Sequence, residues 1–257
     1  MTNPGRAMPT FAATERARIL AALQTHANRA QGPFLRAYLG SPLPVLGVRT
    51  PDYRRIVRDV RTRLGPTPAE RLPTLLQALW SGTWFEERAV AIELLVVYRD
   101  RNDARTFRLA EPWVDSATGW ALSDSLAAGP IARMVAAEPG RFRELLRWTR
   151  SPNLWRRRAA TYALRDWVRS GDLDRPFRLL ERLVDDPEFW VQRAVGTWLR
   201  ECWKKDRLRT ERFLRRHARA LSRLAITVAT ERASKRFRAE LRRAHTAGTP
   251  SRRRRVY

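Results

Sequence analysis

The sequence predicts an all-α protein built as an α-solenoid of stacked helix pairs. Apolar residues recur at helical spacing between short breaks that contain Pro, Gly, Asp or Asn. No stretch shows credible strand alternation, and one stretch is repeated at an offset of 35 residues. Helix pairs that repeat near this period bury their apolar faces on their neighbours, which is how a solenoid is stabilised.

Taken in order, residues 1–10 show no periodicity and are expected to form a loose leader. A first helix is expected over 10–28 and a short one over 35–39, ended by Gly40-Ser-Pro. The next helix is expected over about 52–64. Its start is indicated by Thr50-Pro-Asp52, in which Thr50 suits the cap, Pro51 the first position and Asp52 the positive helix end. Further helices are expected over 68–80, 83–99, 103–114, 118–137, 139–149, 153–169, 174–184, 187–204 and 208–233.

The predicted domain organisation is one solenoid domain over residues 11–235, followed by a basic, flexible tail over residues 236–257. A chain of 257 residues is long enough to bury a sizeable core. The end of the tail carries the arginine run 252–255, which would add non-specific affinity for polyanions.

The repeat is clearest where Ser151-Pro-Asn-Leu-Trp-Arg-Arg-Arg-Ala-Ala160 matches Asp186-Pro-Glu-Phe-Trp-Val-Gln-Arg-Ala-Val195. Arg158 falls on Arg193, and a weaker third copy places Arg88 two periods before Arg158. The intervening copy would place its arginine at position 123, where the chain has Ser123-Asp124 instead. A carboxylate therefore stands where the flanking repeats offer a cation.

The charge of the chain indicates a polyanionic partner. There are 51 Lys and Arg against 26 Asp and Glu, a formal net charge of +25, which points to nucleic acid or an anionic membrane surface. No signal sequence or apolar run of 18 residues is present, and the single cysteine, Cys202, excludes an internal disulfide framework. We expect a cytoplasmic monomer that neither binds a membrane nor uses a metal or other cofactor.

Two helix faces are expected to line the concave, basic surface of the solenoid. On the helix over 187–204 the polar face carries Arg193, Thr197, Arg200 and Lys204. One repeat earlier, the equivalent face carries Arg158, Tyr162, Arg165 and Arg169. Such ridges would neutralise phosphates and bind DNA in a salt-dependent, sequence-independent manner.

Trp120 and Asp124 are the candidate reactive pair. Residues four apart share a face of a helix, so the indole and the carboxylate would lie one turn from each other.

Several motifs, in this order and spacing, resemble the AlkD-type DNA alkylation-repair glycosylases, which are built from HEAT-like repeats. The resemblance covers roughly residues 30–235. It is carried by Leu46-Gly-Val-Arg-Thr-Pro51, Trp84-Phe-Glu-Glu-Arg-Ala89, Trp120-Ala-Leu-Ser-Asp-Ser125, Asn153-Leu-Trp-Arg-Arg-Arg-Ala-Ala160 and Glu188-Phe-Trp-Val-Gln-Arg-Ala-Val-Gly196.

The resemblance implies a monofunctional glycosylase that removes cationic N3- or N7-alkylated purines from duplex DNA without flipping the base. The family's catalytic aspartate falls on Asp124, its pocket tryptophan on Trp120 and its DNA-gripping arginine on Arg158. Arg49, within the first motif, is a further candidate DNA contact.

The chain departs from the family at two positions. Gly119 stands where the family often has an aromatic residue, and Thr197 where it has a second pocket tryptophan. Trp198 is rotated by about 100° on the helix and lies on the apolar stripe, so the role does not transfer to it. Two alternatives therefore stay open: a non-enzymatic binder of distorted or branched DNA, and an RNA-binding scaffold.

Overall fold

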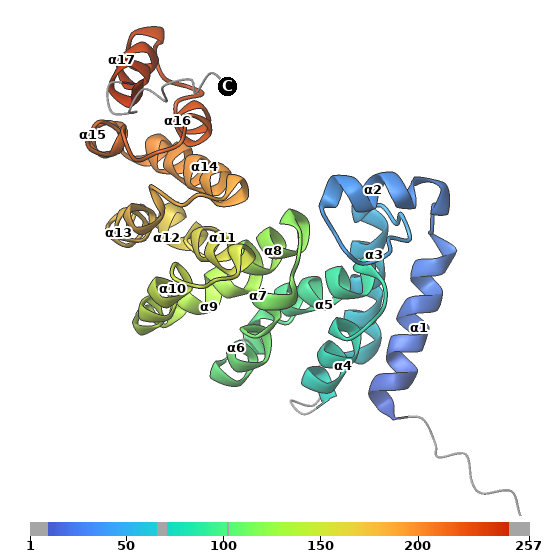
Figure 1. The fold of residues 1–257 in the computed structure, drawn as a ribbon. Helices are drawn as coiled ribbons and strands as arrows, with labels where there is room; N and C mark the ends of the chain where they lie inside the picture. Colours follow the sequence, from blue (N-terminus) through green and yellow to red (C-terminus); the bar gives the residue numbers. More distant parts are fainter. Residues whose placement is uncertain (1–9, 66–70, 102, 247–257) are drawn as a thin grey trace, which may run out of the picture. The chain divides into compact units, whose positions relative to one another are not determined.

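The structure, a computed structural model, describes residues 10–65, 71–101 and 103–246, and these form helices and connecting loops without any strand (Figure 1). The prediction of an all-α fold is confirmed. Among the described helices, none is both long enough and apolar enough to cross a bilayer. The predicted leader lies outside the described residues except for Thr10, which caps the first helix.

The chain divides into two compact units, Met1–Met134 and Val135–Tyr257. The boundary falls within helix α9 (Ala132–Ala137). The expectation of one domain over residues 11–235 stays a prediction.

In unit 1, α1 packs on α3 and α4, and α5 packs on α3, α4 and α8. Its helices are α1 (Phe11–Thr25), η1 (Arg29–Gln31), α2 (Gly32–Leu39), α3 (Thr50–Leu64), α4 (Arg71–Trp80), α5 (Phe85–Val97), η2 (Arg99–Arg101), α6 (Ala104–Ala110), α7 (Trp113–Ser116), α8 (Trp120–Leu126) and the π-helical turn η3 (Ala127–Ile131).

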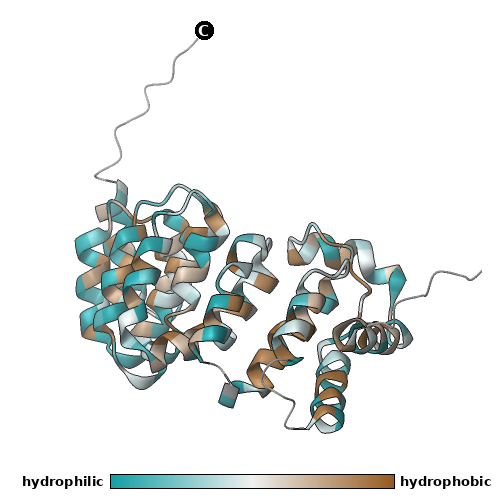
Figure 2. Ribbon diagram, turned by 90° about the horizontal axis from the view of Figure 1, so that it is seen from below, coloured by the Kyte–Doolittle hydropathy of each residue, from teal (hydrophilic) through white to brown (hydrophobic). Residues whose placement is uncertain are grey.

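In unit 2, α11, α14 and α16 contact one another in succession, and α13 and α15 pack against α14 from the other side (Figure 1). Its helices are η4 (Pro139–Arg141), α10 (Phe142–Trp148), α11 (Leu154–Tyr162), α12 (Arg165–Ser170), α13 (Asp174–Leu180), η5 (Glu181–Leu183), α14 (Phe189–Lys205), α15 (Arg207–His217), α16 (Arg223–Ala229) and α17 (Lys235–Thr246). Figure 2 shows apolar residues concentrated where the helices face one another and polar ones on their outer sides.

The repeat predicted from the sequence is visible in where one set of helices begins. These helices are α3, α5, α8, α11, α14 and α16, with starts at Thr50, Phe85, Trp120, Leu154, Phe189 and Arg223. Successive starts are therefore 35, 35, 34, 35 and 34 residues apart. The reactive pair expected at Trp120 and Asp124 belongs to a regular repeat, because Trp120 is the first residue of its helix.

Side-chain caps fix several of these starts. Thr10, Asn153, Asp206 and Ser222 each accept a hydrogen bond from a backbone N–H in the first turn of the helix that follows. Asp103 does the same for α6, and the N–H groups of Thr106 and Arg105 lower the pKa of that carboxyl.

Five expectations about helix boundaries are wrong. The helix expected over 103–114 divides into α6 and α7 at Glu111-Pro112, and the one over 153–169 breaks after Tyr162. The one over 208–233 becomes α15 and α16, and the one over 118–137 is interrupted at Gly129-Pro130. Pro130 lacks the N–H that a continuous ladder needs. The cap of α3 is Arg49, with Thr50 as its first helical residue.

The expected C-terminal tail is also shorter than predicted. Residues 235–246 form α17, which buries Phe237 and Leu241 one turn apart. These two apolar side chains dock the helix, which contacts α15 and α16, despite the many arginines around them. Residues 247–257 lie outside the described part of the chain.

Cys202 lies in the core of unit 2, on the apolar stripe of α14 beside Trp198 and Leu199. Trp198 is buried, as expected, whereas Trp155 and Trp190 are only half-buried. Burial raises the pKa of the Cys202 thiol to about 12.

We therefore expect Cys202 to be inert in the folded protein. A thiolate, which is the reactive form, does not form near pH 8 at this pKa, and the sulfur is fully buried. Iodoacetamide at pH 8 should leave the native protein unmodified and alkylate it fully in guanidinium chloride, as measured by intact mass. Modification of the native protein at the denatured rate would contradict the burial.

Candidate functional site

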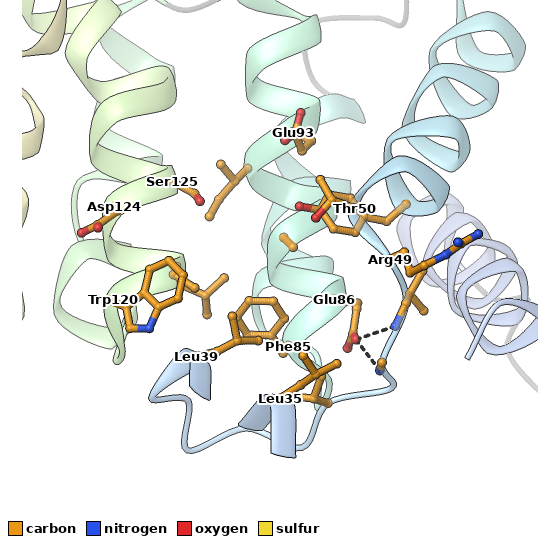
Figure 3. A pocket seen from close by; sticks show the side chains of 18 of the residues that line it. Leu35, Leu39, Arg49, Thr50, Phe85, Glu86, Glu93, Trp120, Asp124 and Ser125 are labelled. Atoms are coloured by element: carbon orange, nitrogen blue, oxygen red, sulfur yellow. Dashed lines mark hydrogen bonds between the residues drawn. The ribbon is translucent and has the colours of Figure 1, made fainter. Parts of the chain in front are cut away.

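An apolar pocket of about 470 Å³ opens in unit 1 between α2, α3, α5 and α8 (Figure 3). Leu39, Phe85 and Ile92 supply apolar wall, and Glu93 adds a carboxylate that pairs with Arg54 at 3.0 Å. The remaining lining residues are Gln31, Leu35, Val45, Gly47, Val48, Arg49, Thr50, Pro51, Tyr53, Glu86, Ala89, Trp120, Ala121, Leu122, Asp124 and Ser125.

A buried glutamate shapes the floor of this pocket. Glu86, 1% exposed, accepts hydrogen bonds from the backbone N–H groups of Leu46 (3.0 Å), Gly47 (2.8 Å) and Val48 (3.2 Å) (Figure 3). These hydrogen bonds hold the loop of the motif Leu46-Gly-Val-Arg-Thr-Pro51, which leads directly into α3. Gly47 has φ +81°, and a Cβ there would lie 2.3 Å from the Asn28 carbonyl oxygen.

The start of α8 is held by α5 and α4. Arg88 donates to the carbonyl of Ser116 at 2.8 Å, and the indole of Trp80 donates to the Ser116 hydroxyl at 3.0 Å. Burial lowers the pKa of the Arg88 guanidinium. Arg88 is therefore a structural residue, which anchors the connection between α7 and α8.

Gly119 caps α8 at a point where two backbones touch. Its φ is +90°, and a Cβ would lie 2.4 Å from the carbonyl oxygen of Gly40 and 2.7 Å from that of Leu39. Neither the conformation nor the space admits a side chain. The departure from the family's aromatic residue at position 119 thus has a physical reason in the C-terminus of α2.

Trp120 is fixed by the same end of α2. Its indole N–H donates to the carbonyl of Tyr38 at 2.7 Å, and its ring meets that of Tyr38 edge to face at 5.4 Å. Tyr38 in turn stacks with Phe34, and both of these rings are exposed. The half-buried indole is therefore preorganised at the mouth of the pocket.

Asp124 follows Trp120 by one turn of α8. The prediction that the two residues lie one turn apart on the same helix is confirmed. In Figure 3 Ser125 points from α8 toward α5, whereas Asp124 projects from the opposite edge of the helix. The half-buried carboxylate lies at the rim of the pocket rather than in its apolar interior.

Asp124 is the fifth residue of α8, and the fifth residues of α3, α11 and α14 are Arg54, Arg158 and Arg193. Counted from α5, which begins 35 residues before α8, Arg88 falls on Ser123 as expected. Counted from α11, which begins 34 residues after α8, Arg158 falls on Asp124, so relative to α3, α11 and α14 the inversion of charge falls on Asp124 itself.

The resemblance implies that Arg158 contacts a DNA phosphate, but this residue is buried, with only 3% of its surface exposed. Its guanidinium donates to the carbonyl of Trp190 at 2.6 Å and to the hydroxyl of Tyr162 at 3.1 Å, and it lies over both rings. Tyr162 meets Trp198 edge to face at 5.6 Å. These contacts join α11 to α14 within unit 2, and a DNA contact by Arg158 stays a prediction.

The ridge expected from Arg158 to Arg169 does not exist on one helix, because α11 ends at Tyr162. Arg165 and Arg169 belong to α12, where Arg165 pairs with its neighbour Asp166 at 2.9 Å. The two arginines therefore cannot continue the face of α11.

The second expected ridge does lie on one continuous helix, α14. Arg193 is exposed and makes no ion pair with any described residue, whereas Arg200 pairs with Glu231 and Lys204 with Glu201. Thr197 donates to the carbonyl of Arg193 at 2.9 Å. In unit 1, Arg49 has an 82% exposed side chain, pairs with Asp52 at 3.1 Å and lines the pocket.

Sequence reasoning missed Glu86, Tyr38 and Leu39 as parts of the site. Only Glu86 left a signal, as an acidic residue that shares a helix face with the apolar Ala89 and Val90. Among the described residues, no group of His, Cys, Asp and Glu is suited to hold a metal ion.

The class of protein that these features define is an all-helical repeat protein whose site pairs a carboxylate with an indole. Residues 19–233 match a family model described as DNA alkylation repair enzyme. Because the match spans most of the sequence, the chain belongs to this family. No curated protein matches it.

Solved structures share the fold at low sequence identity. A "Predicted DNA alkylation repair enzyme" of Enterococcus faecalis is 19% identical with a TM-score of 0.73, covering 82% of this chain and 98% of its own. AlkD2 of Streptococcus mutans is 16% identical with a TM-score of 0.63, covering 86% and 98%. A second Streptococcus mutans protein, smu.31, is 17% identical with a TM-score of 0.53, covering 89% and 98%.

Replacement of Glu86 by Gln should destabilise the protein strongly. The amide keeps the size of the side chain, but it offers one acceptor and two donors to three buried N–H groups. We expect the free energy of unfolding to fall by about 3 kcal/mol, measured by urea denaturation. Glu93→Gln, on the more exposed face of α5, is the control and should cost under about 1 kcal/mol. Equal losses in both variants would contradict the role of Glu86.

Replacement of Gly119 by Ala tests the contact between the two backbones. We expect a loss of about 1–3 kcal/mol in stability, because the methyl group meets the Gly40 carbonyl at a positive φ. Gly140→Ala, at a glycine with open space around it, should change stability little. A thermal melting temperature unchanged by Gly119→Ala would show that α2 and α8 do not touch in this way.

Proposed function

We propose that this protein is a monofunctional DNA glycosylase that hydrolyses the N-glycosidic bond of cationic N3- and N7-alkylated purines in duplex DNA. The observation that carries the proposal is the placement of Asp124 beside Trp120 at the rim of the pocket, where three of the other repeat helices carry arginine at the same helix position. Membership of the DNA alkylation repair enzyme family supports DNA as the partner.

The residue types suit this reaction. A cationic alkylpurine is already a good leaving group, so no general acid is needed. Positive charge develops on the deoxyribose as the bond breaks, and the Asp124 carboxylate can stabilise that charge and orient the attacking water. The face of the Trp120 indole attracts the same developing charge. Because the Trp120 N–H is held by the Tyr38 carbonyl, the ring needs no reorganisation when the substrate arrives.

The base would stay in the duplex during the reaction. Enzymes that flip a base read it in an enclosing pocket, whereas Asp124 projects from the edge of α8 away from the apolar interior. A sugar presented at the rim could reach the carboxylate without insertion of the base. Arg193 and Arg49 are predicted to contact DNA, and both are exposed, so phosphates can reach their guanidinium groups.

A non-enzymatic binder of distorted or branched DNA is the second candidate. Two observations favour it. The Arg158 guanidinium is buried against Trp190 and Tyr162, and Thr197 offers no indole for a second pocket wall. A binder would retain or gain affinity when the negative charge of Asp124 is removed.

The deciding experiment is release of N7-methylguanine and N3-methyladenine from alkylated duplex DNA. We expect Asp124→Asn to lower the rate about 10²- to 10³-fold, as loss of a group that stabilises transition-state charge does, with DNA affinity retained. The control Glu93→Gln removes another pocket-lining carboxylate, one that pairs with Arg54, and should release bases at close to the native rate.

Tight DNA binding without base release by the native protein would favour the binder. Equal loss in Asp124→Asn and Glu93→Gln would argue against a specific role of Asp124. Competition with a matched RNA duplex completes the test, because tighter binding of RNA would count against a role in DNA repair.

A further inference from the structure

Unit 2 carries a cluster of arginines on α10, α13 and α15, which are not the helices that hold the predicted DNA contacts of this unit (α11, α12 and α14). Two depressions, of about 350 and 370 Å³, flank α13 and share Asp174 and Arg178. Together they are lined by six arginines and two carboxylates. We call this surface the arginine face; its arginines are Arg143, Arg175, Arg178, Arg209, Arg212 and Arg216.

The face points away from α14. On α13 the buried side chains include Phe177 and Leu180, and on α15 they include Leu214, while Arg178, Arg212 and Arg216 are exposed. Since α13 and α15 bury their apolar sides in packing on α14, their exposed arginines lie on the opposite side of the unit (Figure 1).

Most of the charge on this face is not neutralised within the protein. Arg175 pairs with Asp172 and Arg209 with Asp174, and Glu181 lies 3.4 Å from the His217 ring. Arg143, Arg178, Arg212 and Arg216 make no ion pair with any described residue. Four exposed guanidinium groups thus remain available to an anion.

The spacing of the arginines fits a phosphate backbone better than a single small anion. Arg209, Arg212 and Arg216 follow one another at three and four residues, so they form one ridge about 10 Å long on α15. α13 provides a second ridge beside it, because Asp174 of α13 pairs with Arg209 at 2.6 Å and the Phe177 ring lies 5.2 Å from that of Phe213. Duplex DNA has one charge per about 1.7 Å of axis, so such a surface meets several phosphates at once.

The rings on the face do not offer a platform for unpaired bases. Phe142 and Phe177 are buried, Phe177 is covered by the Arg209 guanidinium at 4.9 Å, and Phe213 packs on Phe177 and His217. Proteins that bind single strands stack bases on exposed aromatic rings. Contact through the backbone of a duplex is therefore favoured over contact with a single strand.

We propose that the arginine face is a second nucleic-acid surface, which binds the backbone of a DNA duplex other than the one that α11 and α14 of the same unit are predicted to contact. Arginine binds phosphate in bidentate fashion, and Arg178, Arg212 and Arg216 are its central contacts. One protein chain then holds two duplex segments. Binding at this face requires no lesion and does not depend on the proposed base release.

The experiment uses the full chain and two unmodified duplexes, one biotinylated and one fluorescent. The wild-type protein should carry the fluorescent duplex onto streptavidin beads, and sedimentation should find one protein chain with two duplexes. In Arg178→Gln/Arg212→Gln/Arg216→Gln we expect bridging to fall at least tenfold, with binding of the first duplex and base release retained. The salt slope of the second binding step should fall by about 2.7, because three phosphates are no longer neutralised by arginine.

The control removes the same charge elsewhere, as Arg105→Gln/Arg108→Gln/Arg133→Gln in unit 1, where all three arginines are exposed. It should bridge as the wild type does. Equal loss in the two triple variants would overturn the proposal in favour of a net-charge effect. A complex of two protein chains with one duplex each would also overturn it, as would displacement from the face by an acidic polypeptide but not by DNA.

Discussion

The arrangement of unit 1 depends on one buried carboxylate. Glu86 is surrounded by protein and is stable there because three successive backbone N–H groups converge on it. That interaction joins α5 to the loop before α3, and thereby determines where Arg49 and the start of α3 lie relative to the pocket. Glu87, its neighbour, accepts from Arg16 and from the Trp84 N–H, so the same turn of α5 also holds α1.

The repeat provides a second constraint, because each helix start places its fifth residue at an equivalent point of the structure. In three of these helices that residue is arginine, and each arginine has a different role: Arg54 pairs with Glu93, Arg158 joins two helices, and Arg193 is open to solvent. The family resemblance assigned Arg158 to DNA, yet its environment resembles that of a core polar residue. Equivalent position in a repeat thus does not determine equivalent function.

Much of the fold followed from local signals. The helices and their spacing were predicted from apolar residues at helical spacing, from short breaks with Pro, Gly, Asp or Asn, and from the 35-residue repeat. The break between α11 and α12 at Ala163-Leu164 carries no Pro or Gly, so local chemistry could not predict it. The helix α17 was not predicted, because many arginines surround its two buried apolar residues, although Phe237 and Leu241 lie at helical spacing.

The site was predictable only in part. Trp120 and Asp124 could be paired from the sequence because both lie on one helix, whereas the Tyr38 carbonyl that holds Trp120 is 82 residues away along the chain. Burial of Arg158 likewise depends on Trp190, 32 residues further on. Such partners are set by packing between repeats, to which a single sequence gives no direct access.

The contact between Gly40 and Gly119 has a consequence for how this protein can vary. A side chain at position 119 would enter the space of the Gly40 carbonyl, whereas at Gly40 the positive φ of +63°, rather than a lack of space, favours glycine. A change at position 119 therefore requires a change at the end of α2. A homologue with an aromatic residue at the position of Gly119 must have rebuilt the end of α2, so its loop length there should differ as well.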